Sequence, residues 1–424
     1  MNILLIYFSS PELIMPTLPL GLVCVATAVK REGHAVKLVE LSSGSDPLPD
    51  LRLAVEEFPP DAIGLSVRNI DNQAMQGTQF LLEPLKKIVA ACRELTAAPV
   101  LLGGAGYSMY PERILEYLGA DIGIRGDGEL ALPAVLGHLN MKADVTLIKG
   151  VYIQGLSPHI KSCFARDLRG ISAADPSLWL CAESERPGLW MPFQTRRGCP
   201  LGCSYCSTAS IEGTSLRQRP VKAAVDNLAL HAAAGFTRFY CTDNTFNLPA
   251  GYAEDFCRAL SKARLNITWS CIVYPYRVKE ALVSAMAEAG CAEISLGFES
   301  GSEPMLRSMG KRYCLEDVRH AEELFARCGI WQNGYLLLGG PGETKESVLE
   351  SLSFADSLPL ASGKITTGIR IYPHTALAQT ALGQAVIRAD DDLLFPKFYL
   401  ARGLSGWIDE AVEKWMAARP HWHR

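Results

Sequence analysis

The segment Arg197-Gly198-Cys199-Pro200-Leu201-Gly202-Cys203-Ser204-Tyr205-Cys206 carries three cysteines with the spacing Cys-x3-Cys-x2-Cys. Thiolates this close together can bind one soft metal centre, because iron–sulfur clusters are held by cysteine thiolates. A closed structural cluster or a zinc site requires four ligands, so three cysteines leave one iron open to a further molecule. The two glycines allow the backbone to curl around inorganic sulfide. The segment therefore predicts an open-site iron–sulfur cluster.

Two other interpretations of these cysteines stay open. A zinc site usually shows a second pair of cysteines or histidines, and no such pair lies nearby. The three thiols could also be incidental core residues, as we expect of Cys257 and Cys291. The chain has 13 cysteines, an odd number. Without an export signal, this does not predict a disulfide framework, which is typical of small secreted domains.

The residues around and after the cysteine segment alternate between strand and helix patterns. Strands are expected to begin near residues 193, 237, 267, 293, 331 and 364, and helices to cover 221–234, 252–263, 279–289, 315–328 and 344–358. Gly235, Gly290 and Gly329 follow helices where a left-handed cap is favourable. Six such units predict an incompletely closed parallel (β/α)6 barrel over residues 191–375, with a short helical tail over 376–424.

The first part of the chain shows a separate alternation. Apolar strand patterns at 3–8, 36–41, 62–67, 100–102 and 122–124 enclose helical patterns at 20–30, 79–95 and 111–118. This predicts an α/β domain over residues 1–140 with a doubly wound, Rossmann-like parallel sheet. Residues 141–190 do not continue this alternation of strand and helix patterns, which predicts a linker. Its turn signals are Gly155-Leu156-Ser157-Pro158, Pro176 and Pro187.

Length and composition exclude several classes of protein. A chain of 424 residues with 48% apolar and 20% charged residues is globular and too long for one ordinary domain. A net charge of −4 gives no reason to expect a nucleic-acid partner. No apolar run is long enough for a transmembrane segment, and the first residues read as a buried strand instead of a signal peptide. Because free thiols and a cluster need a reducing compartment, we expect a cytoplasmic protein.

The cysteine spacing, with Tyr205 before the last cysteine, resembles the signature of the radical S-adenosyl-L-methionine (SAM) superfamily. Residues 1–140 resemble the cobalamin-binding domain of its cobalamin-dependent branch. This resemblance implies an oxygen-sensitive enzyme that holds a 4Fe-4S cluster on Cys199, Cys203 and Cys206 and uses SAM and cobalamin. A methylthiotransferase is excluded, because residues 1–140 contain only Cys24 and Cys92 and a second cluster needs three cysteines.

The resemblance also implies the residues that contact SAM at the ends of the barrel strands. They are Tyr205, Asp243, Asn244, Glu299, Ser300, Gly339 and Gly340. Asp243 would accept a hydrogen bond from the SAM ammonium, Glu299 would bind the ribose, and the glycines would lie beside the adenine. Structural alternatives remain: Asn244 as a turn cap, Glu299 in an ion pair with Arg307 or Lys311, and residues 339–344 as a plain strand-to-helix turn.

Cobalamin contacts are expected at the start of the first helix and at three strand ends of the first domain. They are Leu20, Gly21, Ser66, Arg68, Asn69, Gly103, Gly104, Ala105, Gly106, Gly126, Asp127, Gly128 and Glu129. The glycine-rich loops would clasp the nucleotide tail. The Asp-x-His-x-x-Gly loop that supplies a lower axial histidine is absent, so Arg68 is a candidate to face the lower side of the cobalt; the alternative is a surface salt bridge.

Two alternatives to cobalamin concern this domain. Ser9-Ser10-Pro11-Glu12 follows the first strand where a dinucleotide site needs Gly-x-Gly-x-x-Gly, which disfavours a nicotinamide or flavin cofactor. A response-regulator-like domain without a ligand stays possible.

The resemblance implies a methyltransferase. The cluster would cleave SAM to a 5′-deoxyadenosyl radical, and methylcobalamin would methylate an unactivated carbon. A non-methylating ring formation or rearrangement is the alternative within the family, and a non-catalytic cobalamin or iron–sulfur sensor is the alternative outside it. The substrate is expected to be a small or lipid-like molecule, with Trp407, Trp415 and Trp422 either near it or anchoring the tail. The electron donor would be a flavodoxin or ferredoxin.

Overall fold

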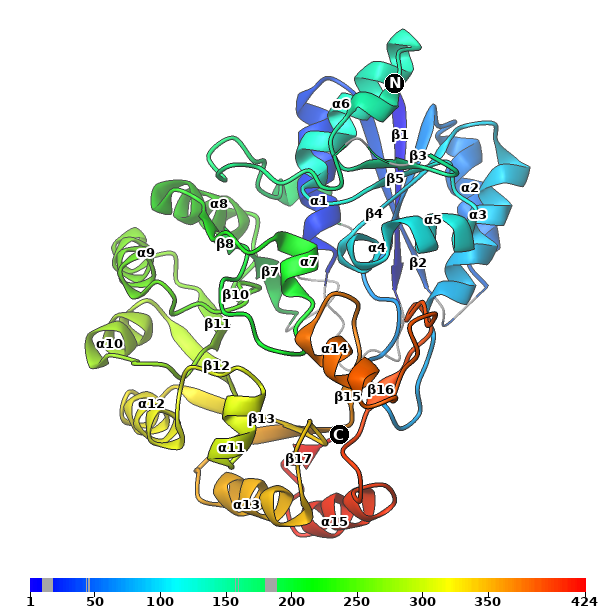
Figure 1. Cartoon of the computed structure of the whole chain (residues 1–424). Coiled ribbons are helices and arrows are strands. Elements are labelled where there is room, and N and C mark those ends of the chain that lie inside the picture. The colour runs from blue at the N-terminus through cyan, green and yellow to red at the C-terminus, as the bar shows by residue number, and fades with distance from the viewer. Residues whose placement is uncertain (10–17, 43, 45, 157, 159, 180–188) are drawn as a thin grey trace. The chain divides into compact units, whose positions relative to one another are not determined.

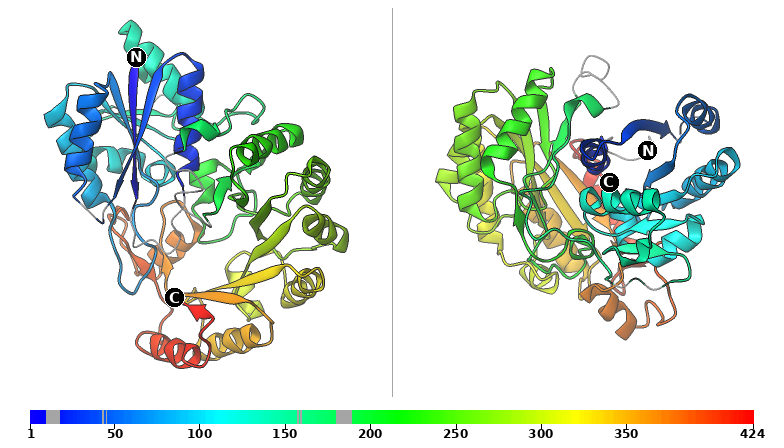
Figure 2. Two further views of the ribbon diagram at one scale, coloured as in Figure 1. Left: turned by 180° about the vertical axis from the view of Figure 1, so that it is seen from behind. Right: turned by 90° about the horizontal axis from the view of Figure 1, so that it is seen from above.

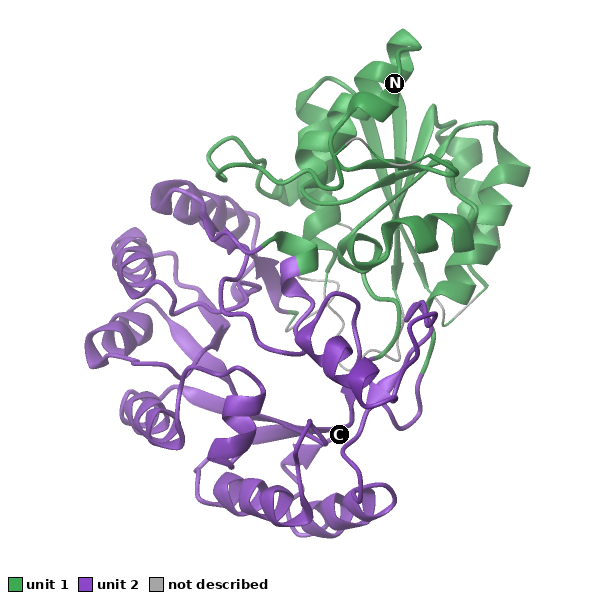
Figure 3. Ribbon diagram, in the orientation of Figure 1, with its two compact units in different colours: residues 1–72, 79–189, 210–213 green, residues 73–78, 190–209, 214–424 purple. Residues whose placement is uncertain are grey.

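The computed structural model describes residues 1–9, 18–42, 44, 46–156, 158, 160–179 and 189–424. Within them the chain forms two compact units (Figure 3). Unit 1 contains residues 1–72, 79–189 and 210–213, and unit 2 contains residues 73–78, 190–209 and 214–424. Each unit is built around its own sheet.

The sheet of unit 1 has the strand order β2-β1-β3-β4-β5-β6. Its strands are β1 (Asn2–Ser9), β2 (Ala35–Ser42), β3 (Ala62–Ser66), β4 (Val100–Gly103), β5 (Ile122–Ile124) and β6 (Val151–Ile153). All neighbours pair in parallel except β6, which runs antiparallel to β5. The α/β class and the parallel doubly wound sheet are thereby confirmed.

Helices cover both faces of this sheet, as Figure 1 shows. On one side α1 packs against α6, and on the other α3 packs against α2 and α5. Their bounds are α1 (Leu20–Arg31), α2 (Leu48–Glu57), α3 (Leu82–Leu95), α4 (Ala105–Met109), α5 (Pro111–Leu118) and α6 (Gly128–Met141). Because both faces are buried, the inner strand β1 reads as a continuous apolar run, with Ile3 to Ile6 almost fully buried.

The sheet of unit 2 has the order β17-β14-β13-β12-β11-β10-β7, and its neighbours all pair in parallel. Its strands are β7 (Met191–Phe193), β10 (Arg238–Cys241), β11 (Thr268–Val273), β12 (Cys291–Glu299), β13 (Trp331–Leu338), β14 (Ser362–Thr367) and β17 (Trp422–His423). Figure 2 shows the helices on the outside of the curved sheet. The predicted six-strand partial barrel is confirmed, and the tail adds a seventh, edge strand.

The predicted helix ranges of unit 2 are matched by α8 (Val221–Ala233), α9 (Ala250–Ala263), α10 (Glu280–Glu288), α12 (Leu315–Arg327) and α13 (Lys345–Asp356). The structure adds α11 (Glu303–Ser308), which was not predicted, and the tail contains α14 (Ala376–Gly383) and α15 (Trp407–Met416). The helix α7 (Thr208–Glu212) follows the cysteine segment. The glycines expected after helices have positive φ angles, +99° at Gly235, +85° at Gly290 and +70° at Gly329.

Two sequence predictions need correction. Residues 141–190 are not a plain connector: β6 joins the sheet of unit 1, and Val145, Val151 and Cys163 lie in its core. Ser157 and Pro187, two of the expected turn residues, lie outside the described residues. The tail is also not only helical, because it supplies β17 and the strand β16 (Phe398–Tyr399), which pairs antiparallel with β15 (Ile369–Arg370).

Within the described ranges, no helix has both the length and the apolar character needed to cross a membrane.

Candidate functional site

The three cysteines lie on the loop between β8 (Arg196–Arg197) and α7. Cys199, Cys203 and Cys206 are partly exposed, whereas most other described cysteines are buried. Backbone hydrogen bonds fix the loop: Ser204 N–H donates to Met309 O at 2.9 Å, and Leu377 N–H donates to Ser204 O at 2.8 Å. Residues far along the chain therefore hold the loop in place with its thiols accessible.

The exposure of the three thiols is compatible with a role as cluster ligands. Among the described residues, no group of three His, Cys, Asp or Glu side chains is placed to hold a single metal ion. Cys199, Cys203 and Cys206 lie on one loop and are all partly exposed. Three such thiols fit a 4Fe-4S cluster, whose irons are bound by cysteine thiolates.

The sulfurs also share a polar environment. Burial raises the pKa of Cys203, Lys311 opposes that rise, and the neighbouring Cys206 adds to it. The Cys206 thiol lies 3.2 Å from the Thr208 hydroxyl, which in turn donates to Asn244 Oδ1 at 3.3 Å. Asn244, at the end of the second barrel strand, is thus connected to a predicted cluster ligand.

Lys311 lies between Glu299 and Tyr205 and connects them by hydrogen bonds. The Lys311 ammonium donates to Tyr205 Oη at 2.9 Å and to Glu299 Oε1 at 3.1 Å. No described residue donates to Glu299 Oε2, and the side chain keeps 18% of its surface exposed. Lys311, one of the two predicted ion-pair partners of Glu299, therefore holds Oε1. Oε2 is available to accept a hydrogen bond from a ribose hydroxyl.

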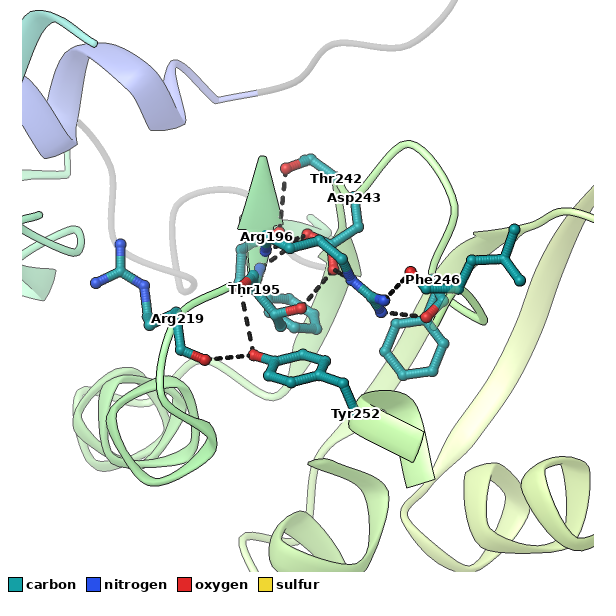
Figure 4. Close-up of polar contacts among 9 residues, drawn as sticks. Thr195, Arg196, Arg219, Thr242, Asp243, Phe246 and Tyr252 are labelled. Carbon is teal, nitrogen blue, oxygen red and sulfur yellow. Dashed lines mark hydrogen bonds and ion pairs between the residues drawn. The ribbon is translucent and has the colours of Figure 1, made fainter. Parts of the chain in front are cut away.

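Asp243 lies at the strand end predicted for SAM, but its carboxylate is fully buried. Oδ1 accepts from Thr195 N–H at 2.8 Å and Arg196 N–H at 3.1 Å, and Oδ2 accepts from Thr195 Oγ1 at 2.5 Å and Arg196 Nε at 3.0 Å (Figure 4). Four donors satisfy both oxygens. This geometry does not support the expected contact with the SAM ammonium, and Asp243 instead anchors the strand that leads into the cysteine loop.

Arg196 completes this buried group. Its guanidinium also donates to the carbonyl oxygens of Phe246 and Leu248 and lies over the rings of Phe246 and Tyr252. Tyr252 donates to Arg219 O at 2.7 Å, as Figure 4 shows. The cluster loop is therefore preceded by a rigid polar core.

The other predicted SAM residues also make internal contacts. Ser300 is fully buried, and its hydroxyl lies 2.9 Å from Ser351 Oγ and accepts from Ser302 N–H. The N–H groups of Gly339 and Gly340 donate to Glu343 Oε2. Gly339 has a φ of +101°, and a Cβ there would lie 2.7 Å from Leu400, so glycine is required by the fold itself. These contacts give Ser300 a structural role, and its contact with SAM stays a prediction.

In unit 1 a narrow pocket lies at the topological switch point, where β1 separates β2 from β3. It is lined by Tyr7, Phe8, Ser66, Arg68, Asn69, Leu81 and Leu85. Ligands of open α/β sheets bind at such points. Three predicted cobalamin residues, Ser66, Arg68 and Asn69, thus lie in one pocket. No ion pair of the described residues involves Arg68, so the alternative role of Arg68 in a surface salt bridge is not seen.

The remaining cobalamin candidates flank neighbouring strand ends. A Cβ on Gly104 would lie 2.6 Å from Val67 O, and one on Gly126 would lie 2.2 Å from Cys163 O. Asp127 is buried, and its Oδ2 accepts from Ala165 N–H at 2.7 Å. Close packing of these loops already explains their small residues. Leu20 and Gly21 begin α1, Gly103, Ala105 and Gly106 surround the start of α4, and Gly128 and Glu129 begin α6.

Sequence reasoning did not assign a site role to Lys311, Thr208, Arg196 or Thr195. Lys311 was named only as an ion-pair partner, and its contact with Tyr205 spans 106 positions of the chain. No local pattern marks such pairs, because their contacts arise from packing of distant segments.

Comparison with known proteins agrees with the division of the chain. Residues 194–355 match the family model of the radical SAM superfamily, and residues 13–136 match that of the B12 binding domain. The chain is 26% identical over 378 residues to an uncharacterized methyltransferase of Pyrococcus horikoshii, spanning 87% of this chain and 79% of that protein. It is 24% identical over 439 residues to tryptophan 2-C-methyltransferase of Streptomyces laurentii, spanning 87% and 73%.

Solved structures show the same fold. The radical SAM methyltransferase TsrM of Kitasatospora setae, with tryptophan and a SAM analogue bound, matches with a TM-score of 0.84 at 23% identity, over 98% of this chain and 88% of that one. A second structure of TsrM, with cobalamin and a 4Fe-4S cluster bound, matches with a TM-score of 0.79 at 24% identity, over 91% and 76%.

Proposed function

This chain belongs to the cobalamin-dependent radical SAM proteins, and from that premise we propose that it is a methyltransferase acting on an unactivated carbon of a small-molecule or lipid-like substrate. Its cofactors are a 4Fe-4S cluster, SAM and cobalamin. The observation that carries the proposal is the loop with Cys199, Cys203 and Cys206, three accessible thiols in a radical SAM domain that follows a B12 binding domain.

The cofactors supply the difficult chemistry when bound: the cluster provides the electron that cleaves SAM, and methylcobalamin provides the methyl group. The chain's own residues bind and orient. Cys199, Cys203 and Cys206 would each hold one iron. Glu299 would accept a ribose hydroxyl at its available oxygen, and Asn244 would face the methionyl group of SAM.

In unit 1 we assign cobalamin to the switch-point edge, where Arg68 would face the lower side of the cobalt. Changing Arg68 to alanine should alter the spectrum of bound cobalt(II) cobalamin, because the group below the metal changes its ligand field. An unchanged spectrum together with unchanged turnover would remove Arg68 from the site. Lys37→Ala is a matched control, since Lys37 lies on the edge strand β2 and forms an exposed ion pair with Glu57 at the end of α2.

The substrate class rests on the relatives, whose names include a tryptophan methyltransferase. Trp407 and Trp415 line an outer groove between α13 and α15, and Trp422 packs on the edge of the sheet. This arrangement supports their alternative role as anchors of the tail, so the tryptophans lend no weight to a lipid-like substrate. A reducing compartment such as the cytoplasm and a flavodoxin or ferredoxin as electron donor complete the proposal.

The test is anaerobic purification with iron, sulfide and hydroxocobalamin, followed by turnover with SAM, dithionite and candidate small molecules. S-adenosylhomocysteine together with 5′-deoxyadenosine is the expected product pair. 5′-Deoxyadenosine alone would favour ring formation or rearrangement, and S-adenosylhomocysteine alone would contradict the radical step. Intact SAM in the presence of bound cofactors would favour the sensor.

A further inference from the structure

Lys311 is a buried cation beside the predicted SAM site. It follows α11, and its side chain is 4% exposed. Besides its hydrogen bonds to Tyr205 and Glu299, its ammonium lies 5.2 Å from the ring centre of Tyr205 and 5.9 Å from those of Tyr274 and Tyr313. The charge is thus enclosed by one carboxylate and three aromatic rings.

An ammonium in such a place must be compensated, because moving a charge out of water costs several kcal/mol. The Glu299 carboxylate and the negative faces of the tyrosine rings supply that compensation. Burial lowers the pKa of Lys311, but the attraction of Glu299 and Cys203 outweighs it, so that the net direction is upward. Lys311 therefore carries a buried positive charge between Tyr205 and Glu299.

The backbone around Lys311 is fixed to the cysteine loop. Met309 O accepts from Ser204 N–H, and the Arg312 guanidinium donates to Pro200 O at 3.3 Å. Arg312 N–H donates to Tyr274 Oη at 2.9 Å. Segments on both sides of the lysine thus contact residues of the cluster loop or the adjacent strand end, which fixes the position of its charge.

Glu299 needs such a partner. It ends β12 with a φ of +61°, a left-handed conformation that costs energy for a residue with a side chain. Strain of this kind persists only where the surroundings enforce it. The hydrogen bond from Lys311 holds Oε1, and no described residue donates to Oε2.

We propose that Lys311 is a positioning residue that joins the cluster loop to the ribose carboxylate, orienting Glu299 for SAM and making the cluster easier to reduce. The inference rests on the proposed function, since it requires a cluster and SAM. The direction of the second effect follows from charge: reduction adds an electron, and a nearby buried cation stabilises the more negative state.

The experiment compares full-length, cluster-loaded wild type with Lys311→Met, Lys311→Arg and the control Lys364→Met. Lys364 is a partly buried lysine near the beginning of β14. The midpoint potential is measured without SAM by redox titration followed by EPR, and SAM affinity by the change that SAM causes in the EPR signal of the reduced cluster.

Lys311→Met should lower the midpoint potential and weaken SAM binding by about tenfold, the effect of one lost charged hydrogen bond. Lys311→Arg should retain the potential, because it keeps the charge, and Lys364→Met should match wild type. A Lys311→Met protein with a full cluster and wild-type potential and affinity would overturn the inference. Wild type that binds no cluster or does not respond to SAM would instead overturn the proposed function itself.

Removal of Lys311 alone leaves the partly buried Glu299 carboxylate without its partner, and the single variant could fail to fold. A second pair of proteins, the single variant Glu299→Gln and the double variant Lys311→Met/Glu299→Gln, then tests the effect of the Lys311 charge. Neither protein contains an unpaired carboxylate at position 299. Loss of the lysine charge should lower the potential of the double variant relative to Glu299→Gln. Equal potentials in these two proteins would contradict the inference.

Discussion

Asp243 is a residue whose neighbours in sequence and neighbours in space suggest different roles. Beside Asn244 at a strand end it resembles a ligand contact, yet its two oxygens accept from Thr195 and Arg196, with both partners of the ion pair almost fully buried. A buried ion pair contributes little net stability compared with apolar residues, but the loss of one partner leaves the other charge unpaired.

Asp243→Ala should therefore destabilise the protein by about 3–5 kcal/mol, because Arg196 would stay buried without a carboxylate. Asp226→Ala is the matched control: its pair with Lys222 on α8 is exposed, and the expected cost is below about 1 kcal/mol. Denaturant unfolding measures both values. Equal stabilities for the two variants would mean that Asp243 is not the anchor described.

Glu343 predicts a pH dependence of stability. Burial raises its pKa from the ordinary 4.5 to about 7, although the N–H groups of Gly339 and Gly340 oppose the rise. The folded state thus holds a proton that the unfolded state releases. The contribution of Glu343 is fully present below pH 4.5 and is lost as the pH rises through about 7.

Between these limits the stability of wild type should fall by up to about 1.4 kcal/mol per pH unit relative to Glu343→Gln, whose amide does not titrate. Denaturant unfolding at several pH values between 5 and 8, with the two proteins compared at each, isolates this group from all others. Parallel pH profiles would contradict the raised pKa.

At the scale of elements, the tail closes an edge of the barrel sheet. β17 pairs with β14, and the Trp422 ring lies over Gly363 and Gly334, where a Cβ would approach it to 2.3 Å and 3.4 Å. The glycines of β13 and β14 thus make room for one large ring. Trp415 packs against the same ring with centroids 5.2 Å apart.

Trp422→Ala should cost about 3–5 kcal/mol, since it leaves a cavity over Gly363 and Gly334, which have no side chains to fill it. Trp331→Ala, on β13 with 68% of the side chain exposed, should change the stability by no more than about 0.5 kcal/mol. The comparison uses denaturant unfolding followed by far-UV circular dichroism. A small effect of Trp422→Ala would show that β17 adds little to the sheet.

At the scale of the whole molecule, the two cofactor sites are assigned to separate units. The candidate cobalamin residues lie in unit 1, and the cysteine loop lies in unit 2. Each unit buries its own core, and none of the three cysteines lines the switch-point pocket. Loss of one cofactor should therefore leave binding of the other intact.

The triple variant with Cys199, Cys203 and Cys206 changed to alanine should lose its iron, its sulfide and all SAM cleavage, yet bind hydroxocobalamin as wild type does. Metal analysis and the visible spectrum of the protein-bound corrinoid check the two halves. Retained iron or SAM cleavage would refute the cluster assignment. Lost cobalamin in a folded variant would refute the independence of the units.

Much of the architecture could be predicted from sequence because it depends on local periodicity. The strands β1 to β5 and the helix α5 could be predicted because apolar runs alternate with helical patterns along this part of the chain. β17 was missed because two residues are too short to show a period. β6 has as many residues as β5, but it lies in a stretch where the alternation of strand and helix patterns is lost. β6 and β17 become strands only because a sheet edge offers them hydrogen bonds.

The sequence by itself determined the cysteine loop, the two α/β units and the family, because each depends on residues close together in the chain. Only the tertiary structure decided which polar side chains face inward and which meet one another. Asp243 meets Arg196 across 47 positions, and Lys311 meets Tyr205 across 106. The physical reason is that a buried charge must find a partner wherever packing brings one, and no local pattern specifies that partner.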